Sequence, residues 1–423
     1  MKWFCLVLTC AVCGALLGGT ATAQEDPFGP LEFTLKLEAE TSDNRDSAPD
    51  GFEEDNTDFY ISPRIEALYD WERSFLDFYY EPTYRYRTDA SRFQNDTEFY
   101  HDLNLHLRHE LTPRLTVELR EHYNYTDDPL VEEAGQTLRR DSSFSINRVS
   151  GTAILDVAPR LRASVSGYNR IKQYEEEAFD ILDEESSGAS LSFMQLLSRT
   201  LIAVAEVKYD MYEYESDTLG EGILADTLSF DRGSAVTAAG VGFDSEFAEN
   251  CQASVRVGAT TQEFEDDAID SESAPYGLAR IRLASTPATR FNGSILHTQR
   301  DSDVFPFAAQ KYTDLTAGVE IDTTERVTFE VSGTYRLSEY DVDQLPSAAR
   351  AIFEEEALRQ SLISEIATER TGDEEVVILR TGVAIRIQEN TLLRLRYQME
   401  DEDSDVSTSY TRNSGRITLV QSF

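Results

Sequence analysis

Alternation of apolar and polar residues is the feature of this sequence that most restricts its fold. Residues 103–108 read Leu, Asn, Leu, His, Leu, Arg, and residues 115–120 read Leu, Thr, Val, Glu, Leu, Arg. Side chains of a β-strand point alternately to opposite faces, so this pattern predicts strands with one apolar and one polar face. Similar segments begin near residues 161, 255, 279, 327, 379 and 393. We therefore expect an all-β, antiparallel sheet with two different surfaces.

Two kinds of linker alternate between these segments. Longer, acidic linkers rich in Ser and Thr, such as DDPLVEEAGQ at residues 127–136, alternate with tight turns. The tight turns are DWERS, LTPRL, APRL, LSRT, AENC, TPATR, TTER and QEN. Short turns on one rim and long loops on the other are typical of outer-membrane barrels. Counting predicts a transmembrane up-and-down barrel of about 18 strands, within roughly 16 to 20, whose two ends lie on the short-turn rim.

The N-terminal segment predicts export. One lysine precedes an apolar run from Trp3 to Leu17, and the small residues Ala21, Thr22 and Ala23 follow. These are the features of a secretory signal peptide. The expected domains are therefore a signal peptide at residues 1–23 and an outer-membrane β-barrel at residues 24–423. No run of about eighteen apolar residues follows the signal, so membrane crossing must use strands.

Charged residues within the strands fall opposite the leucines. An arginine at the lipid midplane of a barrel costs about 2 to 4 kcal/mol, so the charged face is expected to line the lumen. The predicted pore-lining residues are Arg85, Arg87, Arg108, Arg120, Arg162, Arg170, Arg256, Arg280, Arg282, Arg336, Arg394, Arg396 and Glu118. Lys172, Lys208, Arg380 and Arg386 share their parity. Fewer inward acids are expected, namely Asp77, Glu81, Asp102, Glu110, Glu118, Glu206, Asp210 and Glu330.

Two interpretations of these arginines stay open. An arginine-lined passage would concentrate anions or acidic sugars through focused potential and bidentate carboxylate contacts. Alternatively, the arginines pair with lumen and loop carboxylates and fill the barrel without a transport role. The net charge of −40 argues against nucleic-acid partners, because phosphates would be repelled.

Aromatic residues gather near the expected strand ends. Amphipathic rings are favoured at the two membrane interfaces, which predicts aromatic girdles there. The expected girdle residues are Tyr84, Tyr86, Tyr123, Tyr125, Tyr209, Tyr212, Tyr214, Tyr335, Tyr340 and Trp71. The alternative is that Tyr and Phe are simply good strand residues.

The C-terminal segment GRITLVQSF places Gly415, Ile417, Leu419 and Phe423 on one face and ends at the aromatic residue. It resembles the C-terminal signal that barrel-assembly machinery recognises, and departs from it at Gln421, where an apolar or aromatic residue is usual. The barrel-assembly machinery is therefore an expected partner, together with outer-membrane lipid and lipopolysaccharide.

Residues 345–370 differ from their surroundings. Their apolar residues, from Ala348 to Ile366, have helical spacing, with Ser347 as a cap and Gly372 at the end. We expect a helix in the longest external loop. Folded inward it would constrict the pore, and folded outward it would cover the mouth or meet a partner.

Catalytic and metal-binding motifs are sparse. Only five histidines occur, of which His106 and His122 fall on the inward face, and neither G-x-S-x-G nor H-E-x-x-H is present. We expect no enzyme and no cofactor, with an outer-membrane hydrolase as the least favoured function. The acidic loop SDNRDSAPDGFEED lacks the spacing of a calcium loop, so no metal site is expected.

The segments FYISPRIEALYDWERSFLDFYYEPTYRYRTDA and LTVELREHYNYTDDP make the chain similar to the putative β-barrel porin 2 family. The resemblance is one of pattern over most of the chain after the signal, and it implies the bacterial outer membrane and a channel or export role. The leading hypothesis is passive diffusion or export of small or acidic hydrophilic solutes. The alternative is a non-conducting structural or assembly barrel associated with exopolysaccharide secretion.

Overall fold

The computed structural model describes residues 31–45, 47–49, 51–88, 96–126, 143–175, 183–214, 233–248, 250–265, 269–302, 309–340, 372–405 and 409–423. The predicted signal peptide at residues 1–23 and the predicted helix at residues 345–370 lie outside these ranges. No helix in the described part of the chain is long and apolar enough to cross a membrane.

The described residues form eighteen strands in one sheet. In chain order they are β1 (Leu31–Ser42), β2 (Asn56–Trp71), β3 (Ser74–Arg87), β4 (Thr97–Thr112), β5 (Leu115–Thr126), β6 (Phe144–Ala158), β7 (Leu161–Tyr174), β8 (Glu184–Leu196), β9 (Leu201–Tyr214), β10 (Ser234–Ala248), β11 (Cys251–Phe264), β12 (Glu272–Thr286), β13 (Thr289–Asp301), β14 (Ala309–Thr324), β15 (Val327–Tyr340), β16 (Gly372–Gln388), β17 (Thr391–Ser404) and β18 (Tyr410–Ser422).

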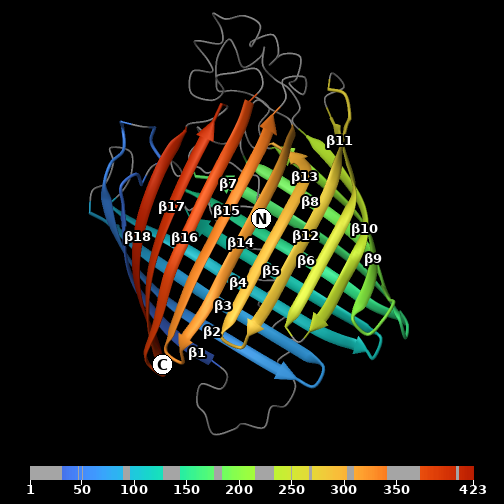
Figure 1. Ribbon diagram of the computed structural model, residues 1–423, viewed down its shortest axis with the longest axis horizontal. Helices are drawn as coiled ribbons and strands as arrows, with labels where there is room; N and C mark the ends of the chain where they lie inside the picture. The colour runs from blue at the N-terminus through green and yellow to red at the C-terminus, as the bar shows by residue number, and fades with distance from the viewer. Residues whose placement is uncertain are drawn as a thin grey trace, which may run out of the picture. The chain divides into compact units, whose positions relative to one another are not determined.

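The sheet closes on itself. Each strand pairs with its neighbours in the sequence, and β1 pairs antiparallel with β18 in a register that places Leu37 opposite Leu419. Closure leaves no unpaired sheet edge, as a membrane interior requires. Figure 1 shows the tilted strands running around the barrel, with the short turns at its lower end. The predicted all-β antiparallel barrel and its strand number are confirmed.

A recurring local pattern explains the short turns. The register shifts by one residue just before six of them, for example between Glu110 and Thr112 and between Asp322 and Thr324. The hydroxyl of Thr112 accepts hydrogen bonds from the amides of residues 114 and 115, at 3.3 and 3.1 Å. Thr324 does the same for residues 326 and 327, at 3.2 and 3.1 Å. At these two turns, a bulge is therefore followed by a threonine that caps the turn.

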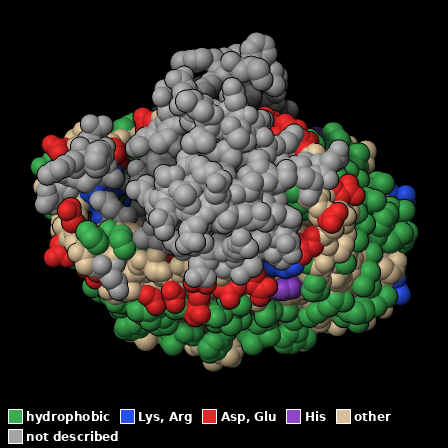
Figure 2. Space-filling view, turned by 90° about the horizontal axis from the view of Figure 1, so that it is seen from above, with side chains coloured by type: hydrophobic (Ala, Val, Ile, Leu, Met, Phe, Trp, Pro, Cys, Tyr) green, Lys and Arg blue, Asp and Glu red, His purple; other side chains and the backbone are tan. Residues whose placement is uncertain are grey.

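The outer surface of the barrel is apolar. Alternate residues such as Leu191, Val241 and Val257 are exposed on it, although they are large and hydrophobic. In Figure 2, seen from the end with the long loops, apolar side chains cover the outer wall and acidic side chains gather along the rim. The exposed rim acids on the outward parity include Glu185, Glu213, Glu263, Glu339, Glu375, Asp401 and Asp403.

The predicted girdle needs one correction. Trp71, Tyr84, Tyr86, Tyr209 and Tyr335 are exposed. In contrast, Tyr212 and Tyr340 are buried, because their even positions turn them toward the lumen, opposite Ser234 and Gln310. Tyr214 shares that parity, and its hydroxyl hydrogen-bonds the Asp301 carboxylate. These three tyrosines therefore belong to the interior and not to a girdle.

The two-sided wall can be tested at adjacent residues. We expect Leu191→Arg, on the outer face of β8, to lower the free energy of unfolding by about 2 to 4 kcal/mol, because the guanidinium would enter hydrocarbon. Ser192→Arg, on the inner face and opposite Glu206, is expected to change it by less than about 1 kcal/mol. Equilibrium unfolding in lipid vesicles measures both values. Equal losses for the two variants would contradict the face assignment.

Candidate pore interior

The predicted pore-lining residues all lie on the face opposite the apolar wall, and they fall into two groups. The first group is concentrated toward the long-loop ends of the strands, where the arginines are buried and paired. Arg85 and Arg87 on β3, Arg170 on β7 and Arg336 on β15 are each at most 8% exposed. Each lies within 4 Å of a carboxylate: Asp58, Glu98, Glu184 and Asp314, respectively.

Arg85 is the best-connected member of this group. Its Nε donates to Oδ2 of Asp58 at 2.8 Å, and its Nη2 donates to the same oxygen. Its Nη1 donates to the hydroxyl of Tyr100 at 2.9 Å, and that hydroxyl in turn donates to Glu98. Arg87 binds both oxygens of Glu98, at 2.6 and 2.7 Å. The register between β2, β3 and β4 brings these side chains together, because Asp58 lies opposite Arg87 and Arg85 opposite Glu98.

The same arrangement joins the first and last strands. Arg412 on β18 donates to Glu40 on β1 at 3.2 Å and lies 3.9 Å from Glu400 on β17. Arg416 donates to Glu40 at 2.6 Å and lies 3.3 Å from Glu38. These ion pairs link strands across the point at which the barrel closes.

The lumen holds more acids than the sequence analysis expected. Glu184, Glu374 and Glu400 lie near the long-loop ends of their strands, so they are easily counted with the acidic loops, but they are buried in the interior. The expected set of inward acids was therefore incomplete. Many of the predicted arginines lie beside a carboxylate that sequence spacing alone does not identify.

The second group of arginines lies toward the short turns and is exposed to the lumen. Arg280, Arg282, Arg386 and Arg394 have no hydrogen bond or ion pair from their side chains to any residue that the structure describes. Arg108 and Arg120 are 50% and 60% exposed and share one carboxylate, Glu118, at 3.9 and 3.2 Å.

Three further predicted arginines lie beside acids on other strands. Arg396 is 48% exposed and donates to Glu330 at 3.0 Å. Arg162 lies 2.9 Å from Asp156, and both are about half exposed. Arg256 binds Asp244 at 2.8 and 2.9 Å and also donates to the backbone carbonyls of Phe243 and Val255. Arg256 therefore contributes more to the wall than to the open lumen.

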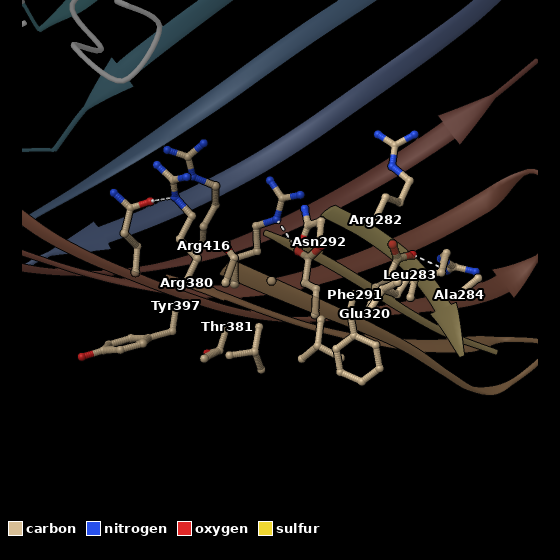
Figure 3. Close-up of a pocket in the computed structure, with 18 of the residues that line it drawn as sticks. Arg282, Leu283, Ala284, Phe291, Asn292, Glu320, Arg380, Thr381, Tyr397 and Arg416 are labelled. Carbon is tan, nitrogen blue, oxygen red and sulfur yellow. Dashed lines mark hydrogen bonds and ion pairs between the residues drawn. The ribbon is translucent and has the colours of Figure 1, made fainter. Parts of the chain in front are cut away.

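A cavity of about 1110 Å³ lies against strands β12 to β18. It extends to Asn250 and Pro287 in two short turns, and six arginines and three glutamates line it. The arginines are Arg282, Arg290, Arg380, Arg396, Arg412 and Arg416. In Figure 3, Arg282, Arg380 and Arg416 point to one side of the sheet, and Tyr397 and Phe291 point to the other. The cavity wall therefore has an excess of positive side chains.

A second cavity of about 370 Å³ adjoins strands β1 to β5. It shares Glu40, Arg396, Arg412 and Arg416 with the first cavity, so the two meet along β17, β18 and β1. Its walls mix both signs of charge, with Lys36, Asp58 and Glu81 among the lining residues.

Sequence reasoning missed three of the cavity arginines. Arg290, Arg412 and Arg416 were not among the predicted pore-lining residues. Arg290 stands next to a short turn and was counted with it, and Arg416 stands within the C-terminal assembly segment. The alternation rule would have found Arg290 and Arg416, because Arg290 precedes outward Phe291 and Arg416 precedes outward Ile417.

The two inward histidines lie beside carboxylates. His106 Nε2 lies 3.7 Å from Glu118, and His122 Nε2 lies 3.1 Å from Asp102. Asp102 also accepts a hydrogen bond from Tyr79 at 3.2 Å. No serine is bonded to either ring among the described residues, so the geometry contains no serine–histidine pair in the lumen.

The predicted assembly residues lie on the outer face of β18. Ile417 and Leu419 face Ala39 and Leu37 of β1, Gly415 faces Thr41, and all three share the outward parity. Phe423 follows β18, and its amide donates to the carbonyl of Phe33 at 2.8 Å.

Comparison with protein families decides the identification. The family model described as putative beta-barrel porin 2 matches residues 28–423, which include every strand described above. This chain belongs to that family. Its place is therefore the bacterial outer membrane, where the apolar outer wall of this porin faces lipid.

Solved structures similar to this porin are outer-membrane proteins of low sequence identity. OpdK from Pseudomonas aeruginosa is 10% identical, with a TM-score of 0.47, and the match covers 93% of this chain and 99% of that one. OccAB4 from Acinetobacter baumannii is 9% identical, with a TM-score of 0.48, and the match covers 94% of this chain and 100% of that one. No curated protein matches the sequence.

Proposed function

We propose that this porin is a passive channel for small hydrophilic solutes and that its interior favours anions over cations. The observation that carries the proposal is the group of exposed lumen arginines without a carboxylate partner among the described residues: Arg280, Arg282, Arg386 and Arg394. Each places a positive guanidinium in the lumen.

The two groups of arginines have different roles in this proposal. The buried pairs near the long loops neutralise each other, so they fix the shape of the wall and add little to the potential in the lumen. The exposed arginines are only partly neutralised, and the apolar wall around them focuses their field into the passage. An anion that enters the lumen therefore finds a favourable potential over the half of the barrel nearer the short turns.

The alternative role is a non-conducting structural barrel that serves exopolysaccharide secretion. The observation that favours it is the dense network around Arg85, Arg87, Asp58 and Glu98, which fills part of the interior with paired side chains. We propose no enzymatic activity, since no serine is bonded to the ring of His106 or His122 among the described residues, and both rings lie beside carboxylates. We also propose that the outer face of β18 is the surface that barrel-assembly machinery recognises.

Reconstitution into planar bilayers tests the channel. We expect stable conductance steps in KCl and, in a salt gradient, a reversal potential whose sign reports chloride as the more permeant ion. Absence of conductance from a correctly folded barrel would favour the structural alternative. Conductance with a cation preference would retain the channel and overturn the assignment of the arginines.

A further inference from the structure

One row of inward residues across the large cavity differs from its neighbours. Read across strands β12 to β16, the residues that face one another are Arg282, Asn292, Gly318, Ser332 and Arg380. All five line the cavity of about 1110 Å³. The row has an arginine at each end and contains no carboxylate.

The next row toward the short turns has the opposite character. There Arg290 faces Glu320, Glu320 faces Glu330, and Arg396 lies beyond Gly382. Arg290 binds Glu320 at 2.5 Å, and Arg396 binds Glu330 at 3.0 Å. The arginines of that row are therefore matched by acids within the row.

The two end arginines keep donors for a solute. Arg282 has no hydrogen bond or ion pair from its side chain within the described ranges. Arg380 donates its Nε to the neutral amide oxygen of Gln398 at 2.8 Å, which leaves its terminal nitrogens available and its charge unmatched in that contact. Figure 3 shows both side chains on the same side of the sheet, opposite Tyr397 and Phe291. A guanidinium can bind a carboxylate through two parallel hydrogen bonds.

The wall between the arginines is neutral and polar. Asn292 and Ser332 supply an amide and a hydroxyl, and the row on the side away from the short turns adds Ser294, Thr316 and Thr334. Gly318 leaves room for the Asn292 amide, because a Cβ at position 318 would come within 2.3 Å of Oδ1 of Asn292. An apolar solute would leave these groups without partners, whereas a hydroxylated solute would bond them.

We propose that this row, which we call the Arg282–Arg380 row, is a binding subsite for an extended dianion with a hydroxylated, uncharged middle. Four strand spacings separate the backbones of the two arginines, roughly 19 Å along the curved wall, so a solute that contacts both must be extended. Sugar diacids have this chemistry. The inference rests on the proposed channel function, because solutes must reach the lumen, and it narrows the preferred anion to one class.

Equilibrium binding to the detergent-solubilised full-length barrel tests the subsite independently of conduction. The probes are glucarate, adipate, which has the same carbon number and two carboxylates without hydroxyls, and gluconate, which has the hydroxyls and one carboxylate. We expect glucarate to bind about tenfold more tightly than adipate or gluconate. Adipate lacks the hydroxyl contacts, and gluconate lacks the contact of the second carboxylate. Equal affinity for all three would overturn the proposal.

Variants locate the site. Arg282→Gln and Arg380→Gln are each expected to weaken glucarate binding about tenfold. The matched control Arg199→Gln, an exposed arginine in the short turn between β8 and β9, is expected to change it less than about twofold. Unchanged glucarate binding in both row variants would overturn the subsite even if the barrel conducts anions. If the unsubstituted barrel binds glucarate but does not conduct ions, the channel proposal is refuted and the subsite proposal is retained.

Discussion

Replacement of Arg85 by alanine is expected to lower the free energy of unfolding of the barrel by about 3 to 5 kcal/mol. Arg85 and Asp58 are both 5% exposed at their side chains, and Arg85 also holds the Tyr100 hydroxyl. Truncation would leave the Asp58 carboxylate buried without the guanidinium that now binds it, and an uncompensated buried charge is strongly destabilising. Unfolding in lipid vesicles, followed by the fluorescence of Trp71 and by gel mobility, measures the loss.

A matched variant and a double variant give this prediction its control. Arg108→Ala removes an arginine that is 50% exposed and lies 3.9 Å from its acid, so we expect a change of at most about 0.5 kcal/mol. In the Arg85→Ala background, Asp58→Ala is expected to cost less than it does alone, because the carboxylate has then lost its partner. Additive losses would show that the pair does not act as a unit.

Replacement of Arg108, Arg120, Arg394 and Arg396 by glutamine is expected to bring the chloride-to-potassium permeability ratio to about one or below. All four are exposed in the lumen, and the two carboxylates that Arg108, Arg120 and Arg396 contact, Glu118 and Glu330, would then lose these counter-charges. Reversal potentials in planar bilayers measure the ratio. Unchanged selectivity would remove these residues from the selectivity mechanism.

The control variant removes the same number of positive charges, but from the short-turn rim of the barrel. Arg73, Arg114, Arg199 and Arg326 lie in or beside short turns, and their replacement by glutamine is expected to shift the ratio less, because charges outside the lumen are screened over about 10 Å. Glu118→Gln should shift the ratio in the opposite direction from the lumen set. It removes the one acid that Arg108 and Arg120 share.

The alternation of apolar and polar residues was sufficient to predict the strands and the face that each presents to lipid. Leucine and arginine cannot exchange faces without placing a guanidinium in hydrocarbon, so each strand fixed its own orientation. The spacing of short turns and long linkers then fixed the direction of the chain. Tyr212 and Tyr340 were misplaced where clustering of aromatics was followed instead of parity.

The pairing of the arginines could not be predicted in the same way. Arg85 and Asp58 are on neighbouring strands, but Arg396 and Glu330 are 66 positions apart and on strands that are not adjacent. Such contacts depend on exact register and on side-chain direction across the curved wall. The Arg282–Arg380 row is likewise invisible in sequence, because its members come from five strands and become a set only when the registers are known.

The buried ion pairs and the exposed arginines lie in different parts of the barrel. Ionic strength is therefore expected to change the stability of the barrel and its ion selectivity to different extents. Salt screens charges in contact with water and barely reaches those enclosed by protein. At high salt concentration the folded barrel would keep its thermodynamic stability, while its discrimination between anions and cations would decrease.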